Sequence, residues 1–409
     1  MNILLFCDEY PPGPHGGIGT AVQTLARELV RQGHGAWVAG LYDYGYGGAD
    51  YEEDHGVHVY RLRKKSEQLG ITLRYNFYDK VVRRLLSLTG QLEREVAEGL
   101  ERLRLLVEKL TADHQIQIAE TPEHQHYTRQ VKKPVFFPEI KVPLVARLHG
   151  GNVYLGAELS RPVGPAALAI EKDLLSRAAA ISSVSRYAAV KTLSLLGLEK
   201  EEARVIPNGI EVPPWIGFEK KDPQQVMFTG SLQAGKGVFQ LMDAWNQVHE
   251  AWPLATLHLY GKGDTAAIKA LLKPGAAETV FFHGHQPRSI VWAALQSAAI
   301  GVFPSFAETF ALAPMEAMAC GVATIFTQRT SGPELIDSGK NGLLIDPTRP
   351  SAIADANLQL LRDKSLREGL ARAGYEKIAF RYAIEGIAAQ HVLFYNAVLS
   401  KGSGLLKNV

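Results

Sequence analysis

The sequence is poor in cysteine: Cys7 and Cys320 are the 2 cysteines among 409 residues. They lie far apart and lack the spacing of a metal site, which excludes a disulfide framework and fits a reducing compartment. Cys7 ends an apolar run, so we expect it to be a buried structural thiol rather than a reactive one.

The sequence also lacks an excess of charge and a long apolar run. Lys plus Arg number 44 and Asp plus Glu 42, so the net charge is +2 and no bulk field favours nucleic acid. No stretch approaches the roughly 18 apolar residues of a membrane-spanning helix. Residues 1–12 lack the early positive charge of a secretory signal. We therefore predict a cytoplasmic protein, free or at the inner face of the membrane, with no nucleic-acid partner.

The composition is that of a globular protein, with 46% hydrophobic and 21% charged residues. At about 150 residues per domain, the length favours two or three domains. Each half of the chain has a strand, a glycine-bearing loop, a helix and another strand, the order of a parallel α/β unit. These segments are 2–7, 11–19, 20–31 and 36–41, and then 225–229, 230–237, 238–248 and 254–260.

The boundary between the two halves is best placed at residues 205–214. This segment, V-I-P-N-G-I-E-V-P-P, carries three prolines and a glycine, and a polar stretch follows it. Near the C-terminus, residues 375–399 have the pattern of one or two helices.

Two glutamates, Glu308 and Glu316, stand in the run P-S-F-A-E-T-F-A-L-A-P-M-E-A-M-A-C-G at 304–321. The run predicts a loop that enters a helix, with the first carboxylate near the helix mouth and the second about two turns inside. Free N–H groups at a helix start attract phosphate, and nearby carboxylates can bind sugar hydroxyls. Here they would be the amides of Thr309, Phe310, Ala311 and Leu312. A sugar nucleotide is therefore suggested; a solvated helix start is the alternative.

This run resembles the glutamate-seven-glutamate motif of retaining glycosyltransferases with the GT-B fold, the family 4-like "glycosyl transferases group 1". That family usually reads E-G-F-G-L where this chain reads E-T-F-A-L. The resemblance extends over residues 2–395 and is weakest at 43–113. It implies two Rossmann-like domains with parallel sheets facing a central cleft.

The resemblance also implies a division of labour between the domains. Residues 1–206, with a C-terminal crossover helix at about 383–400, would form the acceptor-side domain. Residues 207–382 would form the nucleotide-sugar donor domain.

The loop P-P-G-P-H-G-G-I-G follows the first strand and opens a helix, where glycines let backbone approach a phosphate. It is not a G-x-G-x-x-G sequence, and no acidic residue marks a ribose after the second strand, so a dinucleotide site is disfavoured. An ordinary strand-to-helix turn is the alternative. The resemblance implies that Gly16 and Gly17 face the donor diphosphate and the acceptor.

His149 ends a strand in P-L-V-A-R-L-H-G-G, where open α/β sheets bind their ligands. The run matches the family's L-H-G motif, which implies a catalytic role on the sugar and acceptor side. The alternative is a satisfied core histidine.

Lys236 lies in the glycine-rich loop F-T-G-S-L-Q-A-G-K-G-V and can supply a point charge for phosphate. The family reads G-R-L-x-x-x-K-G, with both cations on the diphosphate. Here Gly230 is kept but Ser231 replaces the arginine, so the hydroxyl donates more weakly, another cation compensates, or catalysis is poor. A solvated surface lysine is the alternative for Lys236.

The resemblance assigns the remaining donor contacts. Glu316 would hold the ribose hydroxyls. Glu308 would hold the sugar hydroxyls and would be a catalytic residue together with His149. G-H-Q at 284–286 would place His285 near the base. His283 and His285 could form a metal pair, but no carboxylate has matching spacing, and no D-x-D motif is present. We predict no metal and no cofactor, with a nucleotide-diphosphate sugar as co-substrate.

The basic, amphipathic region 80–110 has apolar residues at helical spacing. One interpretation is a helix packed on its domain with a solvated charged face. The other is a peripheral membrane or acceptor contact, which the interspersed glutamates disfavour.

Together with these observations, the resemblance implies a retaining, metal-independent hexosyltransferase in polysaccharide biosynthesis. UDP is predicted as the nucleotide because UDP-sugars are common donors, and the acceptor would be a glycan, a lipid-linked glycan or a small molecule. Two alternatives stay open: a sugar-nucleotide hydrolase or epimerase on the same fold, and a non-catalytic sugar-nucleotide-binding relative.

Overall fold

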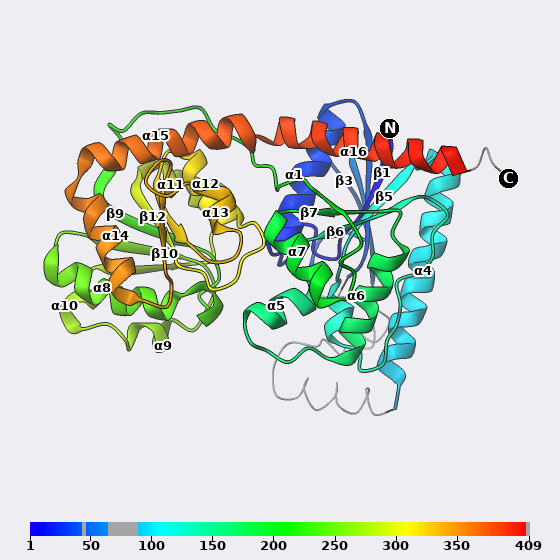
Figure 1. Cartoon of the computed structure of the whole chain (residues 1–409), viewed down its shortest axis with the longest axis horizontal. Coiled ribbons are helices and arrows are strands. Elements are labelled where there is room, and N and C mark those ends of the chain that lie inside the picture. The colour runs from blue at the N-terminus through cyan, green and yellow to red at the C-terminus, as the bar shows by residue number, and fades with distance from the viewer. Residues whose placement is uncertain (43–45, 64–88, 406–409) are drawn as a thin grey trace. The chain divides into compact units, whose positions relative to one another are not determined.

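The computed structural model describes residues 1–42, 46–63 and 89–405 and divides into two compact units. Unit 1 comprises Met1–Gly209 and Ile384–Val409, and unit 2 comprises Ile210–Ala383. Each unit is a twisted sheet with helices on both faces (Figure 1). The predicted class, two α/β domains built on parallel sheets, is therefore confirmed.

Unit 1 contains an eight-stranded sheet with the order β3-β4-β2-β1-β5-β6-β7-β8. Its strands pair in parallel except β3, which is antiparallel to β4. The strands are β1 (Asn2–Phe6), β2 (Gly35–Tyr42), β3 (Tyr51–Asp54), β4 (Val57–Arg63), β5 (Ile118–Pro122), β6 (Leu144–Leu148), β7 (Ala180–Ser183) and β8 (Ala203–Val205). The helices described in this unit are α1 (Gly17–Arg31), α4 (Gln91–His114), the 3₁₀ turn η2 (His126–Arg129), α5 (Asn152–Glu158), α6 (Pro165–Arg177), α7 (Arg186–Leu195) and α16 (Ile384–Leu405).

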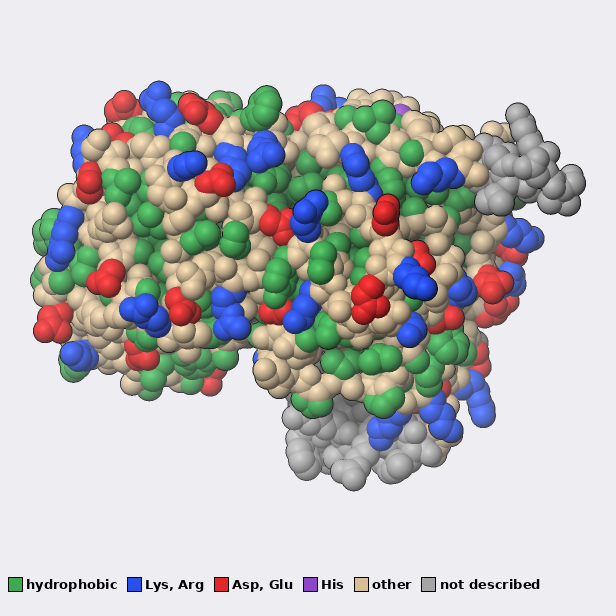
Figure 2. Space-filling view, in the orientation of Figure 1, with side chains coloured by type: hydrophobic (Ala, Val, Ile, Leu, Met, Phe, Trp, Pro, Cys, Tyr) green, Lys and Arg blue, Asp and Glu red, His purple; other side chains and the backbone are tan. Residues whose placement is uncertain are grey.

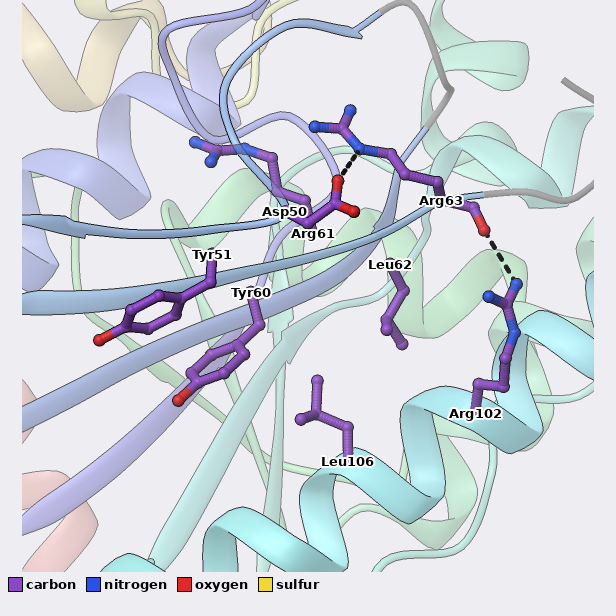
Figure 3. A pocket seen from close by; sticks show the side chains of 8 residues that line it. All are labelled: Asp50, Tyr51, Tyr60, Arg61, Leu62, Arg63, Arg102 and Leu106. Carbon is purple, nitrogen blue, oxygen red and sulfur yellow. Dashed lines mark hydrogen bonds and ion pairs between the residues drawn. The ribbon is translucent and has the colours of Figure 1, made fainter. Parts of the chain in front are cut away.

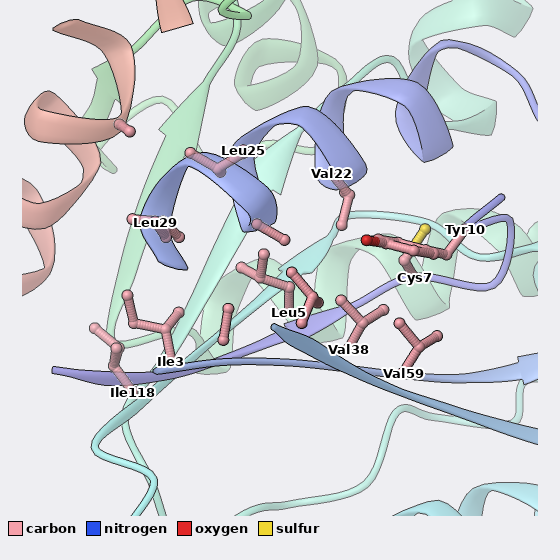
Figure 4. Packing of buried hydrophobic residues seen from close by; sticks show 14 of the residues in the cluster. Ile3, Leu5, Cys7, Tyr10, Val22, Leu25, Leu29, Val38, Val59 and Ile118 are labelled. Carbon is pink, nitrogen blue, oxygen red and sulfur yellow. The ribbon is translucent and has the colours of Figure 1, made fainter. Parts of the chain in front are cut away.

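Strand β1 illustrates why this sequence forms a sheet covered on both faces. Successive side chains alternate between faces, so Ile3 and Leu5 point one way and Leu4 and Phe6 the other. The first pair packs in a cluster with α1 and α16, where Figure 4 shows Leu25 above the sheet. The second pair packs with α4 and α6. Burial on both faces explains the unbroken apolar run, and each such side chain contributes about 1.5–3 kcal/mol.

Unit 2 contains a six-stranded, all-parallel sheet with the order β11-β10-β9-β12-β13-β14. The strands are β9 (Asp222–Thr229), β10 (Thr256–Tyr260), β11 (Val280–Gly284), β12 (Ala298–Phe303), β13 (Ala323–Thr327) and β14 (Leu343–Ile345). The helices are the 3₁₀ turn η3 (Ala234–Lys236), α8 (Val238–Ala251), α9 (Thr265–Lys269), α10 (Pro274–Ala277), α11 (Arg288–Ser297), α12 (Leu312–Ala319), α13 (Gly332–Leu335), α14 (Pro350–Arg362) and α15 (Lys364–Arg381).

Several element boundaries differ from the sequence predictions by one to three residues, and at two of them long-range contacts are involved. Helix α1 begins at Gly17 rather than at residue 20, since the Gly19 amide donates to the Glu9 carboxylate at 2.7 Å. Strand β9 begins at Asp222 rather than at residue 225, since Asp222 pairs with Ala298 of β12. The C-terminal segment forms two helices, α15 and α16, as one of the two predicted options allowed.

Lys221 contacts the C-terminal ends of two helices, α11 and α12, that carry candidate site residues. Its Nζ donates to the carbonyl oxygens of Leu295, Gln296, Ala298 and Cys320 at 2.9–3.3 Å, at the C-terminal ends of α11 and α12. Burial lowers the pKa of Lys221 to about 8. A cation at two helix C-termini satisfies carbonyl groups that have no partner within their own helix.

Cys7 and Cys320 are both buried free thiols, and burial raises the pKa of Cys7. The expectation of a buried thiol at Cys7 is confirmed. Among the helices that the structure describes, none is long and apolar enough to cross a membrane.

Candidate functional site

The C-terminal ends of parallel strands meet at one edge of a sheet, where α/β proteins bind ligands. In unit 2, the loops after β9, β12 and β13 are joined there by hydrogen bonds. The Phe306 amide donates to the Gly235 carbonyl at 2.9 Å. The Glu308 amide donates to Thr330 Oγ1 at 3.2 Å, and Ser331 Oγ donates to the Glu308 carbonyl at 3.4 Å. These contacts bring Lys236 and Glu308 to the same place.

Lys236 and Glu308 form an ion pair in which Nζ lies 2.6 Å from Oε1. The Glu308 side chain is 11% exposed and that of Lys236 is 34% exposed, so the pair lies at the surface of the loop cluster. The sequence predicted these two residues for different parts of one ligand. An ammonium has three donors, so Lys236 can hold Glu308 and still donate to a second anion.

Glu316 lies on α12 beside Arg288, which begins α11. Arg288 Nε is 3.2 Å from Glu316 Oε1, and Arg288 Nη1 is 2.9 Å from Glu211 Oε2. The guanidinium also lies over the Trp292 ring at 4.4 Å from its centre. Burial raises the pKa of Glu316, and Arg288 opposes that shift. Sequence reasoning missed Arg288 because its partners are separated from it by 28 and 77 residues.

The start of α12 corrects two sequence predictions, the set of amides at the helix mouth and the depth of Glu316 in the helix. The helix begins at Leu312 with Ala311 as its N-cap, so Thr309 and Phe310 lie before it and their amides are not helix-terminal donors. Glu316 is the fifth helical residue, just over one turn inside rather than two. The cap carries no side-chain hydrogen bond, so the amides at the helix mouth are those of Ala311, Leu312 and Ala313.

Gly230 and Ser231 follow β9 directly. Gly230 has φ +144° and Gly261 has φ +155°, and a Cβ on Gly261 would lie 1.7 Å from the Gly230 carbonyl oxygen. This close crossing requires glycine. In the described part of the chain, no residue hydrogen-bonds the Ser231 hydroxyl. Lys262 and Arg329 are cations in the loops after β10 and β13 at the same edge.

His285 follows the edge strand β11 and is exposed. His283, two residues earlier, turns toward β10: its Nε2 lies 2.9 Å from Nδ1 of His258, and its ring stacks on Tyr260 at 4.2 Å. His283 therefore contacts residues of β10, whereas His285 is exposed. Within residues 1–42, 46–63 and 89–405, no group of three or more potential ligands could hold a metal ion.

In unit 1, His149 lies immediately after β6, a strand inside the sheet. The side chain is half-buried. Burial, reinforced by Arg147, lowers the pKa of His149 to about 3. The imidazole is therefore neutral at physiological pH and can act as a hydrogen-bond donor or acceptor without carrying charge.

The backbone that follows β6 is held by two buried carboxylates that sequence reasoning missed, Glu123 at His149 and Glu171 at Asn152. Glu123 accepts from the amides of His149, Gly150 and Gly151, and Glu171 accepts from the amide of Asn152. Glu123 directly follows β5, and this strand-end position is the one sequence signal that could have identified it. Glu171 lies within α6 and has no such signal.

Gly16 and Gly17 stand at the start of α1, after β1. Here the protein provides its own anion: a Cβ on Gly16 would lie 3.4 Å from both Glu9 carboxylate oxygens, and the Gly19 amide donates to Glu9. Gly17 faces open space. A diphosphate bound at this helix start would have to compete with the Glu9 carboxylate.

Unit 1 also contains a pocket of about 320 Å³, between the β3–β4 hairpin and α4 (Figure 3). Arg63 Nε donates to Asp50 Oδ1 at 2.9 Å, and Arg102 Nη2 donates to the Arg63 carbonyl at 2.9 Å. Tyr60, Leu62 and Leu106 supply apolar lining. None of the residues predicted for sugar-nucleotide chemistry lines this pocket.

Of the basic region 80–110, residues 80–88 lie outside the described residues. Residues 91–110 belong to α4, where Arg104 pairs with Glu101 at 2.7 Å and with Glu108 at 2.9 Å. Lys/Arg and Asp/Glu side chains are interspersed on the face shown in Figure 2. Pairing within the helix favours a solvated charged face for this part of the region.

Two family descriptions match the chain. "Glycosyl transferase 4-like domain" matches residues 16–209, and "Glycosyl transferases group 1" matches residues 223–363. An uncharacterized glycosyltransferase of Methanocaldococcus jannaschii is 25% identical over 98% of this chain and 99% of its own length. A phosphatidyl-myo-inositol mannosyltransferase of Mycobacterium leprae is 30% identical over 49% of this chain and 55% of its own.

Solved structures share the fold at lower identity. Sucrose-phosphate synthase of Thermosynechococcus elongatus has a TM-score of 0.73 at 19% identity, covering 98% of this chain and 99% of its own. Anabaena HepE, solved in complex with UDP and glucose, has a TM-score of 0.70 at 18% identity, covering 97% of this chain and 100% of its own.

Proposed function

The chain belongs to the group 1, family 4-like glycosyl transferases and has the GT-B fold, and on this premise we propose that it transfers a hexose from a nucleotide-diphosphate sugar with retention of configuration. The observation that carries the proposal is the Lys236–Glu308 pair beside the uncapped N-terminus of α12. A cation and free helix amides suit a leaving diphosphate, and a carboxylate next to them suits sugar hydroxyls.

We assign the donor contacts to unit 2. Glu316 would hold the ribose hydroxyls and Glu308 the sugar hydroxyls, with Lys236 on the departing diphosphate. His285 would lie near the base, with Gly230 and Ser231 lining the diphosphate side. The helix-mouth amides of Ala311, Leu312 and Ala313 would bind the phosphate oxygens, while Thr309 and Phe310 would line the loop that leads to them.

We assign the sugar and acceptor side to unit 1, with His149 as the catalytic candidate and Gly16 and Gly17 lining the acceptor. The Glu9 carboxylate at the start of α1 favours an acceptor role over a diphosphate role for Gly17. UDP is our choice of nucleotide, which the UDP-bound structure of HepE supports by its shared fold. The acceptor class is a glycan, a lipid-linked glycan or a small molecule.

We place the reaction in the cytoplasm, in polysaccharide biosynthesis. A peripheral membrane contact through residues 80–110 is a weaker proposal, because the described part of α4 pairs its charges internally. Flotation with anionic vesicles tests it: protein that stays in the soluble fraction at low salt rejects the contact.

The test of the function is a thermal-shift screen with nucleoside diphosphates and their sugars, because a ligand that binds the folded state raises Tm. The best donor is then incubated with candidate acceptors, and the anomeric configuration of the product is read by NMR. An inverted product contradicts retention. Release of free sugar without an acceptor indicates the hydrolase alternative, and binding without turnover indicates the non-catalytic one.

Transfer should survive excess chelator. The proposed diphosphate contacts are Lys236 and the α12 amides, which neutralise the leaving group without a bridging ion. Transfer, or donor hydrolysis if no acceptor is accepted, is measured with and without EDTA. Loss of turnover with EDTA and its return with Mg²⁺ or Mn²⁺ would contradict the scheme.

Ser231→Arg should tighten UDP and GDP binding and make it more sensitive to salt. An arginine presents a planar fork that grips phosphate in two places, whereas serine offers one hydroxyl. Titration at two salt concentrations measures the effect, with Ser231→Gln as a neutral control of comparable length. Unchanged or weaker binding in the arginine variant would mean that another cation, such as Lys262 or Arg329, already fills the position.

A further inference from the structure

Five consecutive backbone amides, from His149 to Val153, donate to two carboxylates. The His149 amide lies 2.8 Å from Glu123 Oε2, and the Gly150 and Gly151 amides lie 2.7 and 2.6 Å from Glu123 Oε1. The Asn152 amide lies 2.7 Å from Glu171 Oε1 and the Val153 amide 3.3 Å from Glu171 Oε2. Such a row of amides is a concavity suited to an anion, and here the chain supplies the anion itself.

The two carboxylates are equally buried, with 0% exposure each, but their electrostatic surroundings differ. Burial alone would raise the pKa of Glu123, yet His124 and the His149 amide hold it below its ordinary value. Burial raises the pKa of Glu171. The neighbours of Glu123 thus favour its charged form, and charged acceptors make the stronger hydrogen bonds.

The backbone is shaped to bring these groups together. Gly150 has φ +94°, a conformation that favours glycine. A Cβ on Gly151 would lie 2.6 Å from Glu171 Oε2. The two glycines after His149 therefore have a structural role: they let the loop backbone approach the two carboxylates closely.

We propose that Glu123 is a positioning residue for the transfer reaction: by binding the His149, Gly150 and Gly151 amides, it fixes the direction in which β6 presents the His149 imidazole. The inference rests on the proposed function of His149. Glu171 instead accepts from the amides of Asn152 and Val153, at the start of α5. A misplacement of about 1 Å in a reacting group can cost about 10²-fold in rate.

The experiment compares Glu123→Gln with the matched control Glu171→Gln. Both replace one buried carboxylate by an amide beside the same helix start, but only the first changes the acceptor of the His149 amide. We expect Glu123→Gln to lower kcat about 10- to 100-fold, with the donor KM and UDP affinity changed by less than about threefold. Glu171→Gln should keep kcat within about threefold of the wild type. Equal losses in both variants, or a wild-type kcat in Glu123→Gln, would overturn the proposal.

A spectroscopic readout separates this inference from the proposed function. Imidazole ¹⁵N resonances of His149 should shift in Glu123→Gln and stay in place in Glu171→Gln, whether or not the protein transfers sugar. An unshifted His149 resonance in Glu123→Gln rejects positioning; if His149→Ala leaves turnover intact while the resonance does shift, the catalytic role of His149 fails instead. Should Glu123→Gln not fold, Glu123→Asp serves: its withdrawn carboxylate should shift the same resonance, and an unshifted one rejects the proposal.

Discussion

His149→Ala will lower kcat about 10²- to 10³-fold while the protein folds normally and binds UDP with nearly unchanged affinity. This is the range lost when one preorganised hydrogen-bonding group near developing charge is removed. The UDP contacts are assigned to unit 2, whereas His149 lies in unit 1. The measurements are kcat, the Kd of UDP and Tm.

The pH dependence of the same enzyme gives a second check. Because burial lowers the pKa of His149 to about 3, its imidazole is already neutral well below pH 6.5. Titration of His149 should therefore not appear in the pH profile of kcat near pH 6.5. If the wild-type profile has an acidic limb there, the same limb should remain in His149→Ala. His126→Ala is the control, because His126 stands near the same sheet edge without an assigned role. An unfolded His149→Ala protein, or one with wild-type turnover, would support a core histidine instead.

Glu316→Ala will weaken the binding of bare UDP about 10- to 100-fold, whereas Glu308→Ala will leave it nearly intact and weaken only the binding of the UDP-sugar. Loss of a charged hydrogen bond costs about 1.5–3 kcal/mol. In the Glu316 variant, Arg288 keeps Glu211 as an ionic partner, so the substitution does not leave the guanidinium without a counter-charge. Calorimetric titration with UDP and with UDP-glucose measures both losses.

The structure sharpens the expectation for Glu308. Its removal frees Lys236 from the 2.6 Å ion pair, so bare UDP should bind as well as or slightly better than in the wild type. Glu308→Gln serves as a control that keeps the shape of the side chain and removes its charge. If both alanine variants weaken bare UDP equally, the proposed division between ribose and sugar is wrong.

The sequence alone was enough to predict the fold class and the family. The fold class depends on the alternation of strand and helix patterns along the chain, and the family depends on short motifs. The unbroken apolar run of β1 follows from burial on both faces of a sheet, and that pattern is legible without coordinates. The glutamate-seven-glutamate run and the L-H-G run likewise combine residue types at short spacing. Local chemistry of this kind does not need the tertiary structure.

Tertiary structure decided how the site residues pair and where the helix begins. The start of α12 at Leu312 depends on a loop tied to Thr330 and Ser331 of another strand end, a constraint that no local pattern carries. Lys236 and Glu308 are 72 residues apart, and the Glu123 and His149 contact spans 26. Parallel strands place their C-terminal ends side by side whatever their separation in sequence, so the sequence determined which groups the protein has, and the sheet determined which of them meet.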